Sequence, residues 1–124
     1  MTMLRSLMMA TAIVCALLAA VSTCGQDTSA MGVAFNQCSA CHSVDGTNGT
    51  GPTLKGIIGR KSGTVPGFRY SRAMKNAAIT WDEASVDRYL SNPQDVVPGN
   101  IMPFSGVADA ARRANLIAYL KTLR

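Results

Sequence analysis

The sequence predicts a small all-α domain whose helices are joined by long loops. Apolar residues recur at helical spacing in three segments, and a fourth helical segment is short. No stretch predicts a convincing strand, and glycine and proline punctuate the segments between the helices. The 124 residues contain no internal repeat and no linker between two domains, so we expect one domain with three main helices and one short helix.

The first half of the domain is predicted to hold one long and one short helix. The long helix covers 31–41, with Thr28 or Ser29 as its cap. Residues 45–52 include three glycines, but they lack the Gly-Lys-Ser/Thr ending and the preceding strand of a phosphate-binding loop, so we interpret them as an ordinary loop. The short helix is expected over 71–76.

The second half is predicted to hold two helices separated by an irregular segment. Thr80 and Glu83 have the spacing of a capping box, which predicts a helix that begins there and stops at Asn92-Pro93. Residues 95–106 are rich in proline and glycine and predict an extended loop. Asp109 is predicted to cap the final helix, which carries a stripe of alanine, isoleucine and leucine.

The strongest motif is Cys38-Ser-Ala-Cys41-His42, which has the spacing of a c-type haem attachment site. Each thiol can add to one haem vinyl group, and the adjacent imidazole can reach the iron. A zinc site is the weaker alternative, because the chain has one histidine and the other two cysteines lie in or beside an apolar N-terminal stretch. A redox dithiol is disfavoured because no strand precedes the motif.

The N-terminus is predicted to be an export signal. Residues 7–21 form an apolar run after Arg5, too short for a membrane span and typical of a signal peptide, with cleavage expected after Ser22. Cys24 allows an alternative, a lipoprotein signal to residue 23 with a lipid on Cys24, and an uncleaved anchor is a third possibility. We assign 1–22 to the signal peptide, 23–30 to a linker and 31–124 to the domain, and expect the protein in the periplasm, tethered or free.

The net charge of +5 and the isoelectric point near 9.3 predict a basic surface. The cations are scattered, and neither a basic run nor an RNA-binding aromatic motif is present, so we expect no nucleic-acid partner. A basic face that steers the protein toward an acidic docking surface fits this distribution better.

A haem iron held by His42 has one further axial position, and no second histidine is available. Met31, Met74 and Met102 are the methionines outside the signal segment, and lysine, water or an empty position are the other possibilities. Met102 lies between two prolines that stiffen its backbone, so we favour it as the ligand over a role in core packing.

With these motifs in hand, the chain from residue 31 to its C-terminus resembles the class I cytochromes c of the mitochondrial and small bacterial periplasmic type. The fold that this resemblance implies is the small cytochrome c fold, with its helices and loops wrapped round one covalent haem c. The matching stretches keep their order and spacing, and they are residues 35–42, 51–60, 67–71, 79–81, 89–93, 98–102 and 116–120.

The resemblance implies a role for each residue around the iron. Cys38 and Cys41 would hold the haem covalently, and His42 and Met102 would be the axial ligands. The carbonyl of Pro52 would accept a hydrogen bond from the distal nitrogen of His42 and so fix the orientation of the ring.

The resemblance also implies a set of residues around the rim and walls of the pocket. Arg60, Tyr70 and Trp81 would hydrogen-bond the haem propionates. Tyr89 would point its hydroxyl at the Met102 sulfur, and Phe104 would cover the exposed haem edge.

Several positions depart from the family pattern. Asn100 stands where a threonine often binds a propionate, and we place it in the cofactor site on that ground. Met74 replaces an asparagine of a pocket water network, and Ile101 replaces a lysine beside the ligand methionine.

The resemblance also implies that the first and last helices would cross, with Phe35, Leu116 and Tyr119 at the contact.

The function we predict is one-electron transfer without catalysis, by a monomer that shuttles electrons between respiratory or photosynthetic complexes. Its partners would be a cytochrome bc complex as donor and a terminal oxidase or peroxidase as acceptor. Two alternatives remain at this stage: a haem subunit of a larger dehydrogenase or oxidase, and a haem enzyme or gas sensor with a displaceable sixth ligand.

Overall fold

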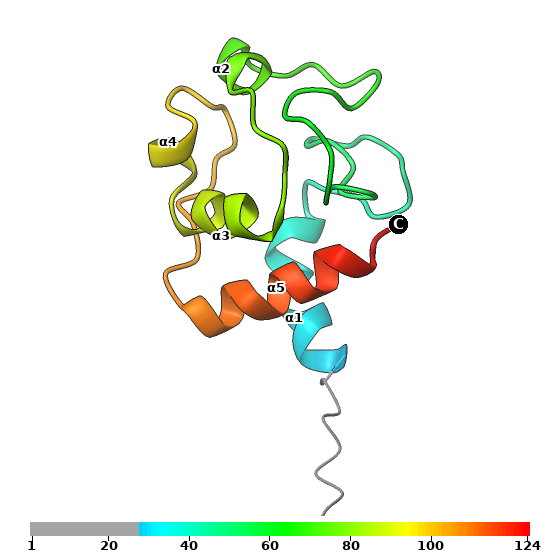
Figure 1. Cartoon of the computed structure of the whole chain (residues 1–124). Coiled ribbons are helices and arrows are strands. Elements are labelled where there is room, and N and C mark those ends of the chain that lie inside the picture. Colours follow the sequence, from blue (N-terminus) through cyan, green and yellow to red (C-terminus); the bar gives the residue numbers. More distant parts are fainter. Residues whose placement is uncertain (1–27) are drawn as a thin grey trace, which may run out of the picture.

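The computed structural model describes residues 28–124, which form helices joined by long irregular loops (Figure 1). The helices are α1 (Thr28–Ser39), α2 (Arg72–Asn76), α3 (Glu83–Ser91), α4 (Pro93–Val96) and α5 (Ala110–Thr122). Within these residues the only β structure is a single bridge between Lys61 and Thr80, so the all-α prediction is confirmed. The predicted signal peptide, 1–22, and the first part of the predicted linker lie outside the described residues.

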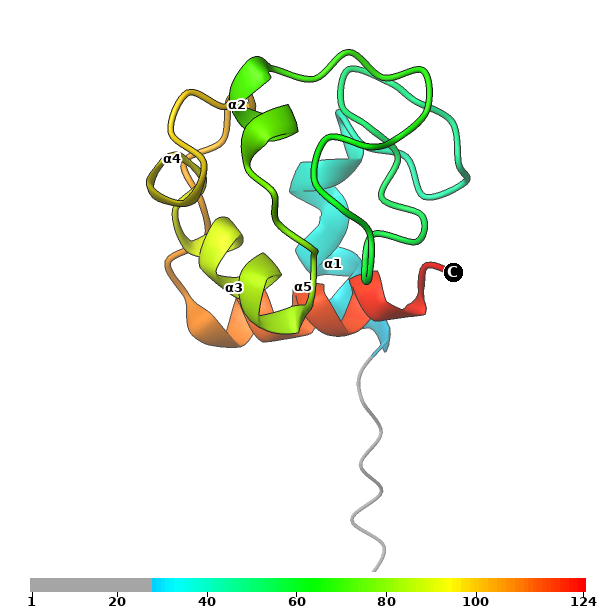
Figure 2. The ribbon, with the colours of Figure 1, turned by 45° about the horizontal axis from the view of Figure 1, so that its top comes forward.

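The N- and C-terminal helices, α1 and α5, cross and pack against each other (Figures 1 and 2). Phe35 of α1 meets Tyr119 of α5 with ring centroids 5.1 Å apart in a tilted arrangement. Leu116, which is 2% exposed, lies in the same cluster of buried side chains. The predicted helix crossing with these three residues is therefore confirmed, and it joins the two ends of the domain by apolar burial and aromatic contact.

Helix α1 differs from the prediction at both ends. It begins at Thr28, inside the predicted linker 23–30, and ends at Ser39, before the predicted end at residue 41. The carbonyl oxygen of Cys38 accepts from the amides of both Cys41 (3.1 Å) and His42 (2.9 Å). The chain therefore leaves the helix in a tight turn inside the Cys-x-x-Cys-His motif, and this turn brings both cysteines and the histidine to one end of α1.

The capping box of α3 lies two residues further along the chain than predicted. Asp82, not Thr80, is the N-cap: Oδ1 of Asp82 accepts from the amide of Ser85 at 2.7 Å, and Oγ of Ser85 accepts from the amide of Asp82 at 2.8 Å. Thr80 is part of the bridge to Lys61, and Trp81 exchanges backbone hydrogen bonds with residues 59 and 60. This extended pairing occupies the backbone up to Trp81, so the helix begins only after it.

Helix α4 is absent from the predicted elements. We expected the chain to stay extended over 95–106, but Pro93–Val96 forms one further helical turn, with Pro93 at its first position. Proline at a helix start needs no amide partner, so Pro93 both stops α3 and begins α4. The remaining segment is irregular as expected. The short helix α2, capped by Ser71, and the cap of α5 by Asp109 are confirmed.

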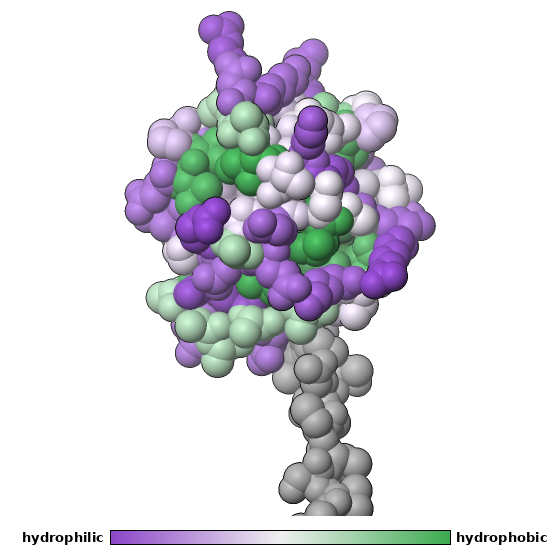
Figure 3. Space-filling model, viewed as in Figure 1, coloured by the Kyte–Doolittle hydropathy of each residue, from purple (hydrophilic) through white to green (hydrophobic). Residues whose placement is uncertain are grey.

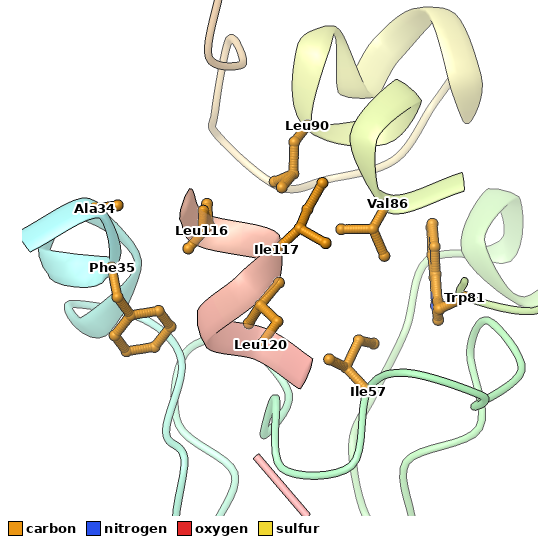
Figure 4. Packing of buried hydrophobic residues seen from close by; sticks show 9 residues of the cluster. All are labelled: Ala34, Phe35, Ile57, Trp81, Val86, Leu90, Leu116, Ile117 and Leu120. Atoms are coloured by element: carbon orange, nitrogen blue, oxygen red, sulfur yellow. The ribbon is translucent and has the colours of Figure 1, made fainter. Parts of the chain in front are cut away.

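The core is a cluster of buried apolar side chains from α1, α3, α5 and the segments on either side of α2 (Figure 4). Its members are Ala34, Phe35, Ile57, Trp81, Val86, Leu90, Leu116, Ile117 and Leu120. In Figures 1 and 2, α3 and the crossed helices lie on one side of the molecule, and α2 and the long loops lie on the other. The cavity described below is lined in part by six of these core side chains, those of Ile57, Trp81, Val86, Leu90, Leu116 and Leu120.

The surface seen in Figure 3 mixes polar and apolar residues, with long hydrophilic side chains extending from it. Among residues 28–124, no helix has the length and apolar character that a membrane crossing requires.

Candidate haem site

The helices and loops enclose a cavity of about 470 Å³. Its volume falls within the range of cavities that hold small molecules and cofactors. The walls come from the end of α1, the loops on either side of α2, the facing sides of α3 and α5, and the segment after α4. All eleven residues predicted to form the cofactor site line this one cavity: Cys38, Cys41, His42, Pro52, Arg60, Tyr70, Trp81, Tyr89, Asn100, Met102 and Phe104.

The two thiols of the motif lie at the cavity wall where α1 ends. Neither forms a disulfide, and both side chains are partly buried. Burial, with the charge of Cys41 as a second cause, raises the pKa of Cys38 above its ordinary value.

The imidazole of His42 is fixed by one hydrogen bond and one close backbone contact. Nδ1 lies 2.7 Å from the carbonyl oxygen of Pro52, so the expected contact between these residues is present. A carbonyl only accepts, so Nδ1 donates and the neutral ring keeps its lone pair on Nε2, where a metal can bind.

Gly51 supplies the close contact, and our sequence analysis gave it no role. A Cβ placed on Gly51 would lie 2.6 Å from Cε1 and 2.7 Å from Nδ1 of His42. Only glycine leaves room for the ring to lie against the backbone there. The Gly-Pro pair after a glycine-rich loop is the sequence signal that points to this position.

Met102 reaches the same cavity from a segment sixty residues further along the chain. Its amide donates to Oδ1 of Asn100 at 3.0 Å, and its carbonyl accepts from the amide of Phe104 at 2.8 Å. The backbone of the predicted ligand is therefore held on both sides.

Arg60 is anchored to the backbone of the preceding loop. Its two terminal nitrogens donate to the carbonyls of Lys55 (3.0 Å) and Thr53 (2.9 Å). Burial lowers the pKa of Arg60, and the neighbouring Tyr70 opposes that shift. These contacts occupy part of the guanidinium's five donors and present a partly buried positive charge at the cavity wall.

The aromatic residues of the cavity pack in pairs. The rings of Trp81 and Tyr89 meet edge to face with centroids 5.0 Å apart, and those of Phe68 and Tyr70 meet similarly at 4.8 Å. Burial raises the pKa of Tyr89 to about 12, so its hydroxyl stays protonated and is a donor at every ordinary pH. Phe68 was not among the predicted residues.

Asn100 makes hydrogen bonds within its own loop that our sequence analysis did not predict. Its side chain is buried, and Nδ2 donates to the carbonyls of Pro93 (3.0 Å) and Val97 (2.9 Å) while Oδ1 accepts from Met102. An amide has two N–H donors, and both are already used within this loop. In this structure the side chain therefore holds the loop that carries Met102.

The donor set fits haem c. Two free thiols, an imidazole with Nε2 available, a thioether and a guanidinium all face one cavity whose remaining walls are mostly apolar and aromatic. Fold and site together define a small helical domain built round one covalently bound haem.

Comparison with known proteins agrees with this class. The model of the family "Cytochrome c" matches residues 32–124. "Cytochrome c2 iso-2" from Magnetospirillum fulvum is 50% identical over 91 residues, which cover 73% of this chain and 95% of that protein. "Cytochrome c2" from Rhodomicrobium vannielii is 50% identical over 90 residues, covering 71% of this chain and 72% of that protein.

A solved structure, "cytochrome cH from Methylobacterium extorquens", superimposes with a TM-score of 0.74 at 43% identity and covers 77% of this chain and 98% of its own. The chain therefore belongs to the cytochrome c family. It is an electron carrier with one covalent haem c, and Cys38 and Cys41 fit the haem-binding motif of that family.

Proposed function

We propose that this protein carries single electrons with His42 and Met102 as the two axial ligands of its haem iron and with no catalytic step of its own. When bound, the haem supplies one reversible electron between ferrous and ferric iron. The observation that carries the proposal is the hydrogen bond from His42 Nδ1 to Pro52, which leaves the lone pair on Nε2 of a ring that lines the same cavity as Met102. No histidine is left over as a general acid or base.

The chain's contribution is to keep this arrangement constant. His42 is held by Pro52 and Gly51, and the backbone of Met102 is held by Asn100 and Phe104. Ligands that stay in place in both oxidation states keep the rearrangement that accompanies electron transfer small. A thioether ligand and apolar walls that exclude water favour the ferrous state and raise the reduction potential.

The polar residues of the cavity would bind the acidic side chains of the cofactor. We propose that Arg60, Tyr70 and Trp81 contact the propionates, because all three line the cavity and Arg60 brings a positive charge with donors to spare. Tyr89, protonated and next to Trp81, is proposed to donate to the sulfur of Met102.

Membership of this family supports a proposal for the location and the partners. We propose that the protein acts in the periplasm after export by residues 1–22, free or tethered through a lipid on Cys24 or an uncleaved anchor. A cytochrome bc complex would be the donor, and a terminal oxidase or peroxidase the acceptor. Ile101, beside the proposed ligand, is 73% exposed and would add an apolar contact to a docking surface there.

The experiment that tests this proposal is expression with the haem maturation machinery, followed by native mass spectrometry and optical spectroscopy. We expect one haem mass on the chain and, in the ferric protein, the weak long-wavelength band of sulfur-to-iron ligation. Met102→Ala should remove that band, lower the reduction potential and let reduced protein bind carbon monoxide. Met74→Ala is the matched control, since Met74 lines the same cavity, and it should keep the band.

The opposite results would contradict the proposal. If Met74→Ala lost the band and Met102→Ala kept it, the ligand assignment would be wrong. If the unmodified ferric protein were high-spin and its reduced form bound carbon monoxide readily, the function would be that of a haem enzyme or gas sensor. Stable co-purification with a dehydrogenase or oxidase would identify a subunit in place of a mobile carrier.

A further inference from the structure

The segment that carries Met102 is tied to α4 by two side chains, those of Gln94 and Asn100. In Figure 1 this segment leaves α4, turns and runs back past α3 toward α5. Residues 97–102 contain no regular structure, so their position depends on contacts other than helical hydrogen bonds. We call the two side chains and the hydrogen bonds described below the 94–100 clamp.

Asn100 supplies three hydrogen bonds of the clamp. Its Nδ2 reaches back to the carbonyl oxygens of Pro93 at 3.0 Å and Val97 at 2.9 Å. Its Oδ1 accepts from the amide of Met102 at 3.0 Å. The side chain is 6% exposed, so water does not compete freely for these contacts.

Gln94 supplies two further hydrogen bonds of the clamp. Its Nε2 donates to the carbonyl of Asn100 at 2.9 Å, and its Oε1 accepts from the amide of Gly99 at 3.2 Å. Gly99 has a φ of +83°, a left-handed conformation that glycine adopts without strain. The glutamine therefore holds the turn in shape, and Asn100 connects the turn to Met102.

Only an amide side chain satisfies all the partners of Asn100. Its environment presents two carbonyl oxygens, which need donors, and one amide, which needs an acceptor. Aspartate has no donor, a hydroxyl has one, and an aliphatic side chain has none. Replacing Asn100 by alanine leaves the amide of Met102 and the carbonyl of Pro93 without these side-chain partners.

We infer that Gln94 and Asn100 are positioning residues that hold the thioether of Met102 at the iron and control how easily an external ligand displaces it. The inference rests on the proposed function, in which Met102 is the sixth ligand. An external ligand binds only the fraction of molecules in which Met102 has left the iron, so its apparent affinity reports that fraction. The clamp is inferred to lower this fraction, because its hydrogen bonds fix the turn at Gly99 and the backbone of Met102 relative to α4.

Titration of the ferric holoprotein with imidazole tests the inference, with the sulfur-to-iron band as the readout. We expect Asn100→Ala to raise the apparent affinity for imidazole at least about tenfold, or about 1.4 kcal/mol, and Gln94→Ala about threefold or more. Gln94 is exposed, so its variant is expected to fold and bind haem even if Asn100→Ala does not.

Two control variants separate positioning from general stability. Asn92→Ala makes the same change two residues before Gln94, where the amide donates only to the exposed carboxylate of Asp95 at 2.7 Å. Arg113→Ala removes an ion pair to Asp87 of α3 and two hydrogen bonds to the carbonyls of residues 107 and 108, and Arg113 does not line the cavity. Both should leave imidazole affinity within twofold of the unmodified protein, even where denaturant midpoints fall.

The outcomes distinguish this inference from the proposed function. Affinities within twofold for Gln94→Ala, and for Asn100→Ala if it folds, in a protein that shows the band, would overturn the clamp and leave the function intact. An equal increase in Arg113→Ala would show that general destabilisation, not the clamp, releases Met102. An unmodified protein without the band would overturn the ligand assignment and this inference together.

Discussion

Substitution of Gly51 by alanine tests whether the close contact with the Gly51 backbone positions the imidazole of His42. The new Cβ would lie 2.6 Å from Cε1, 2.7 Å from Nδ1 and 3.0 Å from Nε2 of the ring. To restore ordinary contact the ring must retreat by about 0.8 Å, since carbon atoms at van der Waals contact lie about 3.4 Å apart or more. The ring cannot retreat freely, because Nδ1 is bonded to Pro52 at 2.7 Å and the backbone of His42 to Cys38 at 2.9 Å.

The expected cost follows from these constraints. Overpacking in a tight site costs about 1–3 kcal/mol, and loss of the His42–Pro52 hydrogen bond adds about 1 kcal/mol. We therefore expect Gly51→Ala to lower the unfolding free energy of the holoprotein by about 2–4 kcal/mol. The absorption bands of the haem should shift as well, because the ring of His42 no longer sits where the unmodified protein holds it.

Denaturant unfolding of the holoprotein, followed by haem absorbance and by helical circular dichroism, measures this cost. Gly32→Ala is the matched control, because Gly32 lies within α1 and nothing approaches its Cβ position within 4 Å. That substitution should leave stability unchanged or raise it slightly, since alanine is the better helix former. A Gly51→Ala protein with the stability and spectrum of the unmodified protein would refute the inference that the Gly51 backbone positions the ring of His42.

Three further predictions concern the scaffold around the site. Hydrogen bonds from Ser85 lower the pKa of the capping carboxylate of Asp82, so its stabilising effect is present above pH about 4 and is lost as pH falls through the lowered folded-state pKa. Asp82→Ala should therefore lower the melting temperature at pH 7, and the difference in melting temperature from the unmodified protein should shrink in acid. A difference that does not change with pH would contradict this reasoning. Arg113 donates to Asp87 at 2.8 Å and to two loop carbonyls at 2.9 Å. Arg113→Ala should therefore lower the unfolding free energy measured with denaturant by about 1–2 kcal/mol, mostly through loss of the hydrogen bonds to the carbonyls. High salt should change this loss of free energy little. Leu116 is 2% exposed, so Leu116→Ala should lower the unfolding free energy by about 2–5 kcal/mol. A smaller loss would mean that neighbouring side chains fill the cavity that the substitution leaves.

Prediction from sequence succeeded where a short local pattern is tied directly to chemistry. The spacing of Cys38, Cys41 and His42 identifies a haem site because three reactive groups must meet one cofactor, and the family comparison supports that cofactor. The cap at Asp109 and the short helix after Ser71 were also predictable, since both depend on residues within one helical turn.

Prediction failed where a distant segment competes for the same backbone groups. Thr80 and Glu83 have the right spacing for a capping box, but residues 59–61 pair with Thr80 and Trp81 and move the cap to Asp82. No sequence pattern near Trp81 predicts that pairing.

Asn100 shows the same limit within the site. The sequence placed Asn100 in the cofactor site but did not predict its hydrogen bonds to the loop, because the carbonyls of Pro93 and Val97 reach its amide only once α4 has formed and the loop has turned back. The sequence by itself therefore determined the cofactor, the helical class and the residues around the cavity, since these depend on residue chemistry and short-range spacing. Only the tertiary structure decided which side chains hold the loop that carries Met102, because their hydrogen-bond partners lie in segments that meet only after folding.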